Sequence, residues 1–399
     1  MNRVVLLTTA EELLTNSRPG EALPFLIRAA RAGGDRFFQA DVLQRRGEAL
    51  RSLSRFEEAL RDYWAAHRLY RLTGVRSERL RTLLGASACL RVLSRYAQAD
   101  RMWRSVSHLL PTFKDAAADP PAEEFKMEIS LVRRGLGDLA GAIKMLNQTI
   151  PRLKKRAKAD ALQHAWWALA GAERFAGRYG RALKAYRRAA ALAHRNRDRP
   201  AEAYANCGEA GCLRILGKGM LSLRLYDRAH NFFVREGDRF GEAYGLCGMG
   251  NALRTYGDPK KAVPLYRRSA ALYARVGDEG SRAFALWGLG GSFRRMGRRD
   301  SAIRFYREAL EPFKKVGDAR GELMALLGLG RTMGETGRGA GAAAVLRRAR
   351  SIALNKKHPY EAALARMELL RLPGDPAPAF LFRPFGVPAS AVRRWMDLP

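Results

Sequence analysis

Apolar residues recur along the chain at the spacing of a helix. Leu246, Met249 and Leu253 fall three or four residues apart, which places them on one side of an α-helix. A similar apolar stripe follows after a short break. The pattern predicts two helices, one over residues 242–255 and one over residues 260–275.

The break between these two helices contains residues suited to helix ends. Gly257 is expected in the left-handed conformation that closes a helix, and Pro259 suits the first turn of the next one. Each second helix is expected to end at a glycine, followed by an aspartate that caps the next helix. These pairs are Gly237-Asp238, Gly277-Asp278 and Gly317-Asp318.

Several positions return after forty residues. The clearest series are Gly248, Gly288 and Gly328; Gly257, Gly297 and Gly337; and Ala262, Ala302 and Ala342. The last series, here called the alanine column, continues towards the N-terminus through Ser222, Ala182, Ala142, Ala99, Ala59 and Ala22. Its nine members predict nine repeating units, each a pair of helices.

The clearest unit carries a known pattern of large and small residues. It reads Leu286, Leu289-Gly290, Phe293, Gly297, Ala302, Tyr306 and Ala309. This pattern resembles the tetratricopeptide-repeat family, in the forty-residue class of LGN/Pins-type and kinesin-light-chain-like proteins. The resemblance covers roughly residues 3–354 and is strongest in the last five units. It implies an all-α fold, a right-handed superhelical solenoid of about nine helix-turn-helix repeats.

The chain divides into three predicted parts. The repeats occupy residues 1–354, a C-terminal capping helix lies within 355–372, and a proline-rich apolar tail follows over 373–399. The capping helix is expected from His358 to Leu372, because the last repeat would otherwise expose its apolar face.

Small residues and tyrosines also form columns. Glycines at 250, 290 and 330 would let the two helices of a unit approach closely, and a tyrosine column fills the space beside them: Tyr186, Tyr226, Tyr266 and Tyr306. Other glycines are expected to leave the floor of a groove open: Gly208, Gly248 and Gly288, with Gly171, Gly211 and Gly291.

Composition adds a strong positive charge. Lys and Arg number 72 against 39 Asp and Glu, a formal net charge of +33. Such a field favours acidic or polyanionic partners. Genomic composition is the alternative source of part of this excess, because arginine and alanine both dominate the sequence.

The sequence predicts neither catalysis nor a cofactor or metal site. The six histidines are scattered, no CxxC pair is present, and four cysteines are too few for a disulfide framework. Cys207 and Cys247 share a column and are interpreted as small groove-lining residues. No apolar run is long enough to span a membrane. The sequence therefore predicts a non-enzymatic cytoplasmic protein that does not insert into membranes.

The main functional signal is a column of arginines eight residues before the alanine column. It consists of Arg51, Arg91, Arg134, Arg174, Arg214, Arg254 and Arg294. In tetratricopeptide repeats this position faces the concave groove, so the resemblance implies ligand binding. Alternatively, each arginine stabilises its own turn by bonding a C-terminal carbonyl or an acidic residue such as Asp258. The two roles are compatible.

Two neighbouring columns supply apolar groups for the same groove. One contains Tyr204, Tyr244 and Phe284, flanked by His164 and Met324; the other contains Trp167, Cys207, Cys247 and Trp287. Asn251 is also assigned to the groove. Arginines beside aromatic side chains suit an extended peptide that bears carboxylates.

The predicted function is that of a protein–protein interaction scaffold or adaptor that binds an acidic, disordered segment of a partner. Two alternatives remain open. One is nucleic-acid binding, in which the arginines follow a phosphate backbone. The other is a regulatory or sensor subunit of a bacterial signalling system. The oligomeric state stays undetermined.

Overall fold

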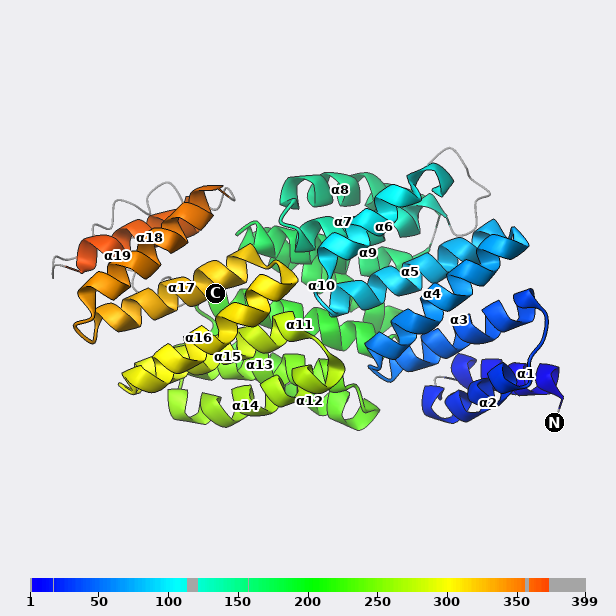
Figure 1. The fold of residues 1–399 in the computed structure, drawn as a ribbon, viewed down its shortest axis with the longest axis horizontal. Coiled ribbons are helices and arrows are strands. Elements are labelled where there is room, and N and C mark those ends of the chain that lie inside the picture. Colours follow the sequence, from blue (N-terminus) through cyan, green and yellow to red (C-terminus); the bar gives the residue numbers. More distant parts are fainter. Residues whose placement is uncertain (1, 17, 113–120, 157, 356–358, 373–399) are drawn as a thin grey trace. The chain divides into compact units, whose positions relative to one another are not determined.

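The computed structural model describes the chain except for residues 1, 17, 113–120, 157, 356–358 and 373–399 (Figure 1). The described residues form nineteen α-helices and one short 3-10 helix, and contain no strand. The predicted tail, 373–399, and His358 lie outside the described residues.

The helices follow one another with short connections. They are α1 (Arg3–Thr15), α2 (Pro19–Arg31), α3 (Arg36–Ser52), α4 (Phe56–Thr73), α5 (Arg76–Val92), α6 (Tyr96–Ser105), η1 (Ser107–Leu109), α7 (Ala122–Gly135), α8 (Leu139–Lys155), α9 (Ala159–Phe175), α10 (Tyr179–Arg195), α11 (Arg199–Ile215), α12 (Gly219–Glu236), α13 (Arg239–Tyr256), α14 (Pro259–Val276), α15 (Glu279–Arg295), α16 (Arg299–Val316), α17 (Ala319–Gly334), α18 (Gly339–Asn355) and α19 (Pro359–Arg371).

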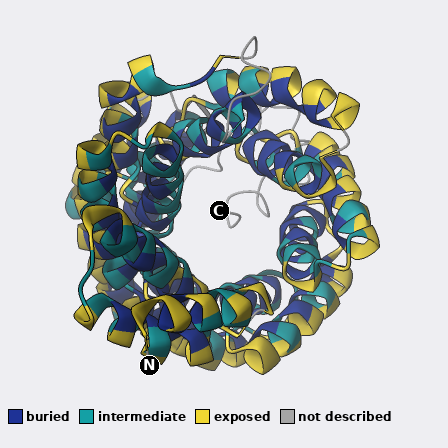
Figure 2. Ribbon diagram, turned by 90° about the vertical axis from the view of Figure 1, so that its right-hand side faces the viewer, coloured by how far each residue is buried: buried dark blue, intermediate teal, exposed yellow. Residues whose placement is uncertain are grey.

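Helices α1 to α18 make nine hairpins, as the alanine column predicts. From α1 to α10 and from α14 to α19, helices that follow one another pack together, and first helices also pack on the first helix of the next hairpin, as in α3 on α5, α7 on α9 and α15 on α17. Figure 2 shows that individual helices are buried along the side that packs on neighbouring helices and exposed along the opposite side. The prediction of a tetratricopeptide-like solenoid is confirmed. Helix α19 packs on α17 and α18.

The structure falls into two compact units. The first holds Met1–Cys212 and Arg228–Glu242, and the second holds Leu213–Asp227 and Ala243–Pro399. The division passes within α11, α12 and α13. Each unit is described separately below. None of the described helices is long and apolar enough to cross a bilayer.

The alanine column lies where the two helices of a hairpin touch. All nine positions, from Ala22 to Ala342 and including Ser222, have an exposed fraction of 0%. A larger side chain would push the second helix away from the first, so the column records a packing requirement.

Each ring of the tyrosine column covers a glycine of the next hairpin, and Tyr266 and Tyr306 also cover one of their own hairpin. A Cβ added at Gly250, in the same hairpin as Tyr266, would lie 3.0 Å from the ring, and one added at Gly288 in the next hairpin would lie 2.3 Å from it. Tyr186 covers Gly208 and Tyr226 covers Gly248 in the same way. The expectation that these glycines leave an open groove floor is therefore wrong, because the tyrosine ring of the preceding hairpin occupies that space.

The Gly-Asp turns are confirmed. Gly237, Gly277 and Gly317 all have positive φ, between 68° and 80°. The aspartate after each glycine accepts a hydrogen bond from a backbone N–H three residues later, at 2.8 to 3.0 Å.

Gly257 does not behave as predicted. It is absent from the left-handed region, although Gly297 and Gly337 of the same column have φ of 76° and 74°. Pro259 starts α14 as expected and holds the preceding residue, Asp258, extended at ψ 112°. The turn therefore closes without a left-handed residue at position 257.

Candidate functional site

The seven arginines of the column occupy one structural position. Each lies one or two residues before the last residue of a first helix, from Arg51 in α3 to Arg294 in α15. Four of them belong to the first compact unit, and the others, Arg214, Arg254 and Arg294, belong to the second.

Several of these arginines are tied to the tyrosine of their own hairpin. The Nε of Arg254 donates to the Tyr266 hydroxyl at 3.2 Å. Arg51 with Tyr63 and Arg174 with Tyr186 make the corresponding hydrogen bonds. These three arginines therefore each bond a tyrosine twelve positions later, a partner that neither interpretation of the column predicted.

Arg91 takes part in a mostly buried network that joins α5 to α7. Its Nε lies 2.5 Å from Oε1 of Glu128, and the Ser87 hydroxyl donates to the same oxygen at 2.7 Å. The indole N–H of Trp103 donates to Ser87 at 3.0 Å. Because both charges are largely shielded from solvent, this pair has a structural role.

Arg134 reaches across to the next first helix. Its guanidinium lies 5.6 Å from the ring centroid of Trp167, and a Cβ added at Gly171 would lie 2.2 Å from its Nη1. Gly291 makes similar room for Arg254, with 3.1 Å to its Cδ. These glycines therefore accommodate the arginine of the preceding hairpin and are not bare floor.

His164 lies among the arginines of the first unit. Its side chain is exposed, and its ring centroid is 5.7 Å from that of Trp167. His164 keeps solvent-accessible surface, but the protein atoms around it reduce its hydration. This loss of hydration, followed by the positive charge of Arg91, lowers the pKa of His164 to about 4; Arg134 and Arg51 also lower it, and Glu128 opposes them. The structure thus brings three column arginines to within electrostatic range of one imidazole.

In the second unit, Arg254 is the most enclosed cation of the column. It is 2% exposed, and its guanidinium lies 4.8 Å from the ring centroid of Trp287. The Tyr266 hydroxyl that it contacts donates in turn to Oδ1 of Asn251 at 2.9 Å. Burial raises the pKa of Tyr266 to about 12, so its hydroxyl keeps the proton that this donation needs.

Arg214 and Cys247 lie close to this group. Arg214 is 3% exposed, and its charge acts on both Tyr266 and Cys247. Burial raises the pKa of the Cys247 thiol to about 11. Cys207 in the first unit is also buried, and all four cysteines are free thiols. These cysteines act as small packing residues.

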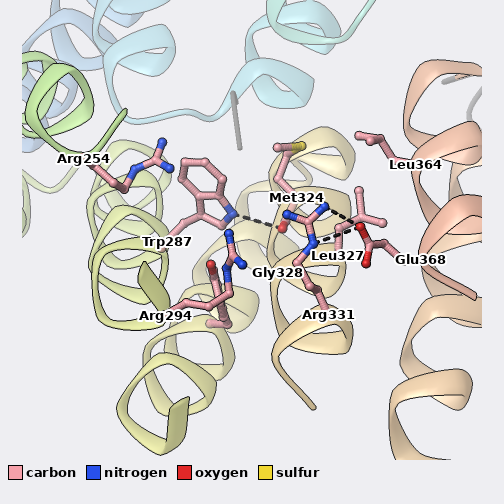
Figure 3. A pocket seen from close by; sticks show the side chains of 11 residues that line it. Arg254, Trp287, Arg294, Met324, Leu327, Gly328, Arg331, Leu364 and Glu368 are labelled. Atoms are coloured by element: carbon pink, nitrogen blue, oxygen red, sulfur yellow. Dashed lines mark hydrogen bonds and ion pairs between the residues drawn. The ribbon is translucent and has the colours of Figure 1, made fainter. Parts of the chain in front are cut away.

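A pocket next to Trp287 collects cationic groups (Figure 3). Arg254, Arg294 and Arg331 line it, together with one carboxylate, Glu368. The pocket is small, with a volume of about 30 Å³. Three guanidinium groups against two carboxylates, Glu368 and the Glu335 that pairs with Arg294, leave surroundings suited to an anionic group.

Arg331 was not predicted from the sequence. In the ninth hairpin the column position is Gly334, and the arginine lies three residues earlier. Its Nε donates to Oε1 of Glu368 at 2.9 Å, and Glu368 is 5% exposed. The out-of-register basic residue is the only sequence signal that could have indicated this cation.

Arg294 forms a more open ion pair. Its Nη1 lies 3.0 Å from Oε1 of Glu335, and 32% of the Glu335 side chain is exposed. Arg299 approaches the other oxygen of Glu335 at 3.6 Å. An incoming carboxylate would compete with Glu335 for Arg294.

The predicted aromatic anchors take part in packing. Tyr204 donates to Asp238 at 2.6 Å, and its ring lies 4.7 Å from that of Phe233. Phe284 packs edge-on against Phe313 at 4.7 Å, and Tyr244 lies 6.5 Å from Tyr226. The indole N–H of Trp287 donates to the carbonyl of Met324 at 3.0 Å. These contacts leave the aromatic column half-buried along the first helices.

The described residues contain no group of three or more His, Cys, Asp or Glu side chains placed to hold a metal ion. The site consists instead of guanidinium groups, tyrosine hydroxyls and apolar rings. Such a set can bind and orient an anionic ligand by charge-assisted hydrogen bonds.

A family model described as tetratricopeptide repeat matches residues 281–355, which extend from α15 to the end of α18. No curated protein sequence matches the chain.

Solved structures resemble the fold over most of the chain. A Rap protein complexed with competence and sporulation factor has a TM-score of 0.62 and 13% identity, over 80% of this chain and 88% of that chain. NprR in complex with its cognate peptide NprX has a TM-score of 0.55 and 14% identity, over 76% and 88%. The apo quorum sensor NprR from B. thuringiensis has a TM-score of 0.53 and 13% identity, over 81% and 92%. At these identities the likeness shows a shared fold.

Proposed function

Because the chain is a tetratricopeptide-repeat protein, we propose that it is a non-enzymatic interaction module that holds an extended acidic segment of a partner protein against its column of arginines. The observation that carries the proposal is the pocket of the second unit, where Arg254, Arg294 and Arg331 face one carboxylate, Glu368.

The geometry supports an ordered arginine surface. Tyr266 and Trp287 hold Arg254 from two sides, so little side-chain entropy would be lost when a carboxylate binds. The partly exposed Arg294–Glu335 pair is weaker and can exchange its acidic partner for one supplied by a ligand.

The fold supports a peptide as the ligand. Two of the solved structures that share it, those of the Rap protein and of NprR, were determined with a bound factor or peptide. A regulatory or sensor subunit would use the same binding surface, so the same experiment applies to it. We also place the protein in the cytoplasm, where a peptide or protein partner is accessible.

Nucleic-acid binding is less well supported. Single-stranded nucleic acid is usually held by aromatic faces on which bases stack. Here Trp287 is 5% exposed, and Tyr204 and Phe284 are engaged by neighbouring rings. The net charge of +33 would still attract phosphates, so nucleic acid has to be tested.

The test is a selection of random displayed peptides on immobilised protein, at low and at physiological salt, with nuclease present. We expect the bound pool to be enriched in Asp and Glu at both salt concentrations, and more weakly at the higher one. An enrichment in neutral or basic peptides, or tight binding only of nuclease-sensitive material, would overturn the proposal.

A further inference from the structure

A cluster of carboxylates lies in the first unit of this otherwise basic chain. Glu11 of α1, Glu48 of α3 and Glu78 of α5 all act electrostatically on Asp41 of α3. Arg45 stands among them, with Nε 3.0 Å from Glu11 and 3.6 Å from Asp41. We call this group the acidic cluster.

The cations within the acidic cluster do not balance it. Arg45 also contacts Glu48, at 3.5 Å, and Arg81 lies 3.3 Å from Glu78. Arg51 also acts electrostatically on Glu48. Four carboxylates against these three guanidinium groups leave an excess of one negative charge, in a chain whose net charge is +33. The cluster therefore carries charge of the opposite sign to the rest of the surface.

The negative charge of Asp41 is destabilised by its surroundings. Burial raises the pKa of Asp41, and the carboxylates of Glu11, Glu78 and Glu48 raise it further, against the opposing charge of Arg45. An additional cation beside Asp41 would relieve both effects.

Two buried polar atoms at the cluster have no hydrogen-bond partner among the described residues. They are the hydroxyl of Tyr70, which is 0% exposed, and Oε1 of Gln44, which is 2% exposed. The amide nitrogen of Gln44 already donates to Glu78 at 3.0 Å, which leaves its oxygen as the unused acceptor. The charges of Asp41 and Glu78 act on the Tyr70 hydroxyl, which places it at the same cluster.

The register of the repeats gives two residues of the acidic cluster the positions of the predicted groove columns. Asp41 stands ten residues before Arg51, the position that Tyr204 and Phe284 occupy in later hairpins. Gln44 stands seven residues before Arg51, the position of Trp287. Along α3, Asp41 and Arg51 are separated by about 15 Å, from the rise of ~1.5 Å per residue.

We infer that the acidic cluster is a subsite of the first unit, which takes a lysine or arginine side chain of a partner segment whose acidic residues lie at the column arginines of the same unit. The inference rests on the proposed function and adds that the partner segment carries both charges, with a basic residue near its acidic stretch. An ammonium group offers three donors, and the cluster offers the Asp41 carboxylate, the Gln44 oxygen and the Tyr70 oxygen as acceptors. A metal ion fits less well, because no three carboxylates of the described residues are grouped closely enough to hold one.

The experiment uses four labelled synthetic peptides and the full chain. The first peptide carries a glutamate stretch and two lysines. In the second peptide glutamine replaces the lysines, and in the third glutamine replaces the glutamates. In the fourth peptide glutamine replaces both. Affinities are measured by fluorescence anisotropy for the wild type and for Asp41→Asn/Glu78→Gln. Glu12→Gln, which removes an exposed carboxylate of α1, is the matched control.

We expect the lysines to tighten binding of the acidic peptide to the wild type and to Glu12→Gln about tenfold, the effect of one charged hydrogen bond. In the double variant they should give no gain. Lysines that add nothing to wild-type binding, or add as much in the double variant, would overturn the inference while the proposed function stands. If the glutamates themselves add nothing, the proposed function fails instead. Should the double variant lose its cooperative melt, Asp41→Asn alone must reduce the gain from lysine severalfold, and an unchanged gain refutes the subsite.

Discussion

The hydroxyl of Tyr266 connects Arg254, a member of the arginine column (here called the arginine face), to Asn251 of the same hairpin. It accepts a hydrogen bond from Arg254 at 3.2 Å and donates one to Asn251 at 2.9 Å. The same twelve-residue spacing links Arg51 to Tyr63 and Arg174 to Tyr186. A tyrosine that packs between two hairpins therefore also fixes the direction of the guanidinium group that we propose as a ligand-binding residue.

Replacing Tyr266 by phenylalanine should lower the free energy of unfolding by about 1–3 kcal/mol, because the buried Arg254 loses a hydrogen-bond acceptor. Chemical denaturation followed by circular dichroism measures the effect. Tyr70→Phe is the matched control: its hydroxyl has no partner among the described residues, so stability should be unchanged or slightly higher. Equal losses in both variants would contradict the role given to Tyr266.

Gly288→Ala should destabilise the second unit by about 1–3 kcal/mol, the usual cost of overpacking. The added methyl group would lie 2.3 Å from the ring of Tyr266, which is 0% exposed. Gly339→Ala tests the same change where no atom lies within 4 Å. There the better helix propensity of alanine should leave stability equal or slightly higher. If Gly288→Ala behaves like Gly339→Ala in thermal unfolding, the tyrosine ring does not pack as described.

Arg197 holds a place that glycine fills in later hairpins. Its φ is 58°, and the corresponding Gly237 has φ 68°. The left-handed region costs a residue with a side chain about 1 kcal/mol or more. Arg197→Gly should therefore raise stability by up to about 1 kcal/mol, and Gly237→Ala, with open space around it, should lower it by a similar amount. Shifts of the same sign in the two variants would refute this assignment.

Folding stability should depend on the protonation of His164. Its pKa is lowered from 6.5 to about 4, chiefly by loss of hydration and by Arg91. The unfolded chain then binds more protons than the folded chain between these values, so stability should fall as the pH drops from 6.5 towards 4 and level off below. His164→Gln should flatten that part of the profile.

An acidic ligand at Arg91 and Arg134 should raise the pKa of His164, which NMR titration of its ring protons would detect. A midpoint near 6.5 in the free protein would contradict the proposed surroundings of His164.

Much of the fold could be predicted from the sequence because its determinants are local and repeated. The alanine column marks positions with no exposed surface, and the Gly-Asp turns adopt the expected conformation. Each depends on helix spacing or turn chemistry within a few residues. Gly257 does not adopt the left-handed conformation that was expected, because Pro259 restricts Asp258, which lies between them, to an extended conformation.

The site was harder to predict because its contacts join different hairpins. Glycines that were expected to leave the groove floor open are covered by a side chain of the preceding hairpin. Tyr266 covers Gly288, and Arg134 covers Gly171. Arg331 pairs with Glu368 of α19, thirty-seven residues away, and falls outside the column register. A column shows which residues share a position, but not which neighbour lies against them.

The most direct test of the account concerns Arg294 and its partner Glu335. We would measure the affinity of a selected acidic peptide for the wild type, Arg294→Gln and Glu335→Gln, with Arg347→Gln as an exposed control of equal charge change. Arg294→Gln should weaken binding about tenfold, the effect of one charge-assisted hydrogen bond. Glu335→Gln should strengthen binding, because the ligand no longer competes for Arg294. If Arg294→Gln binds as Arg347→Gln does, or if Glu335→Gln weakens binding, the arginine face does not hold the acidic peptide.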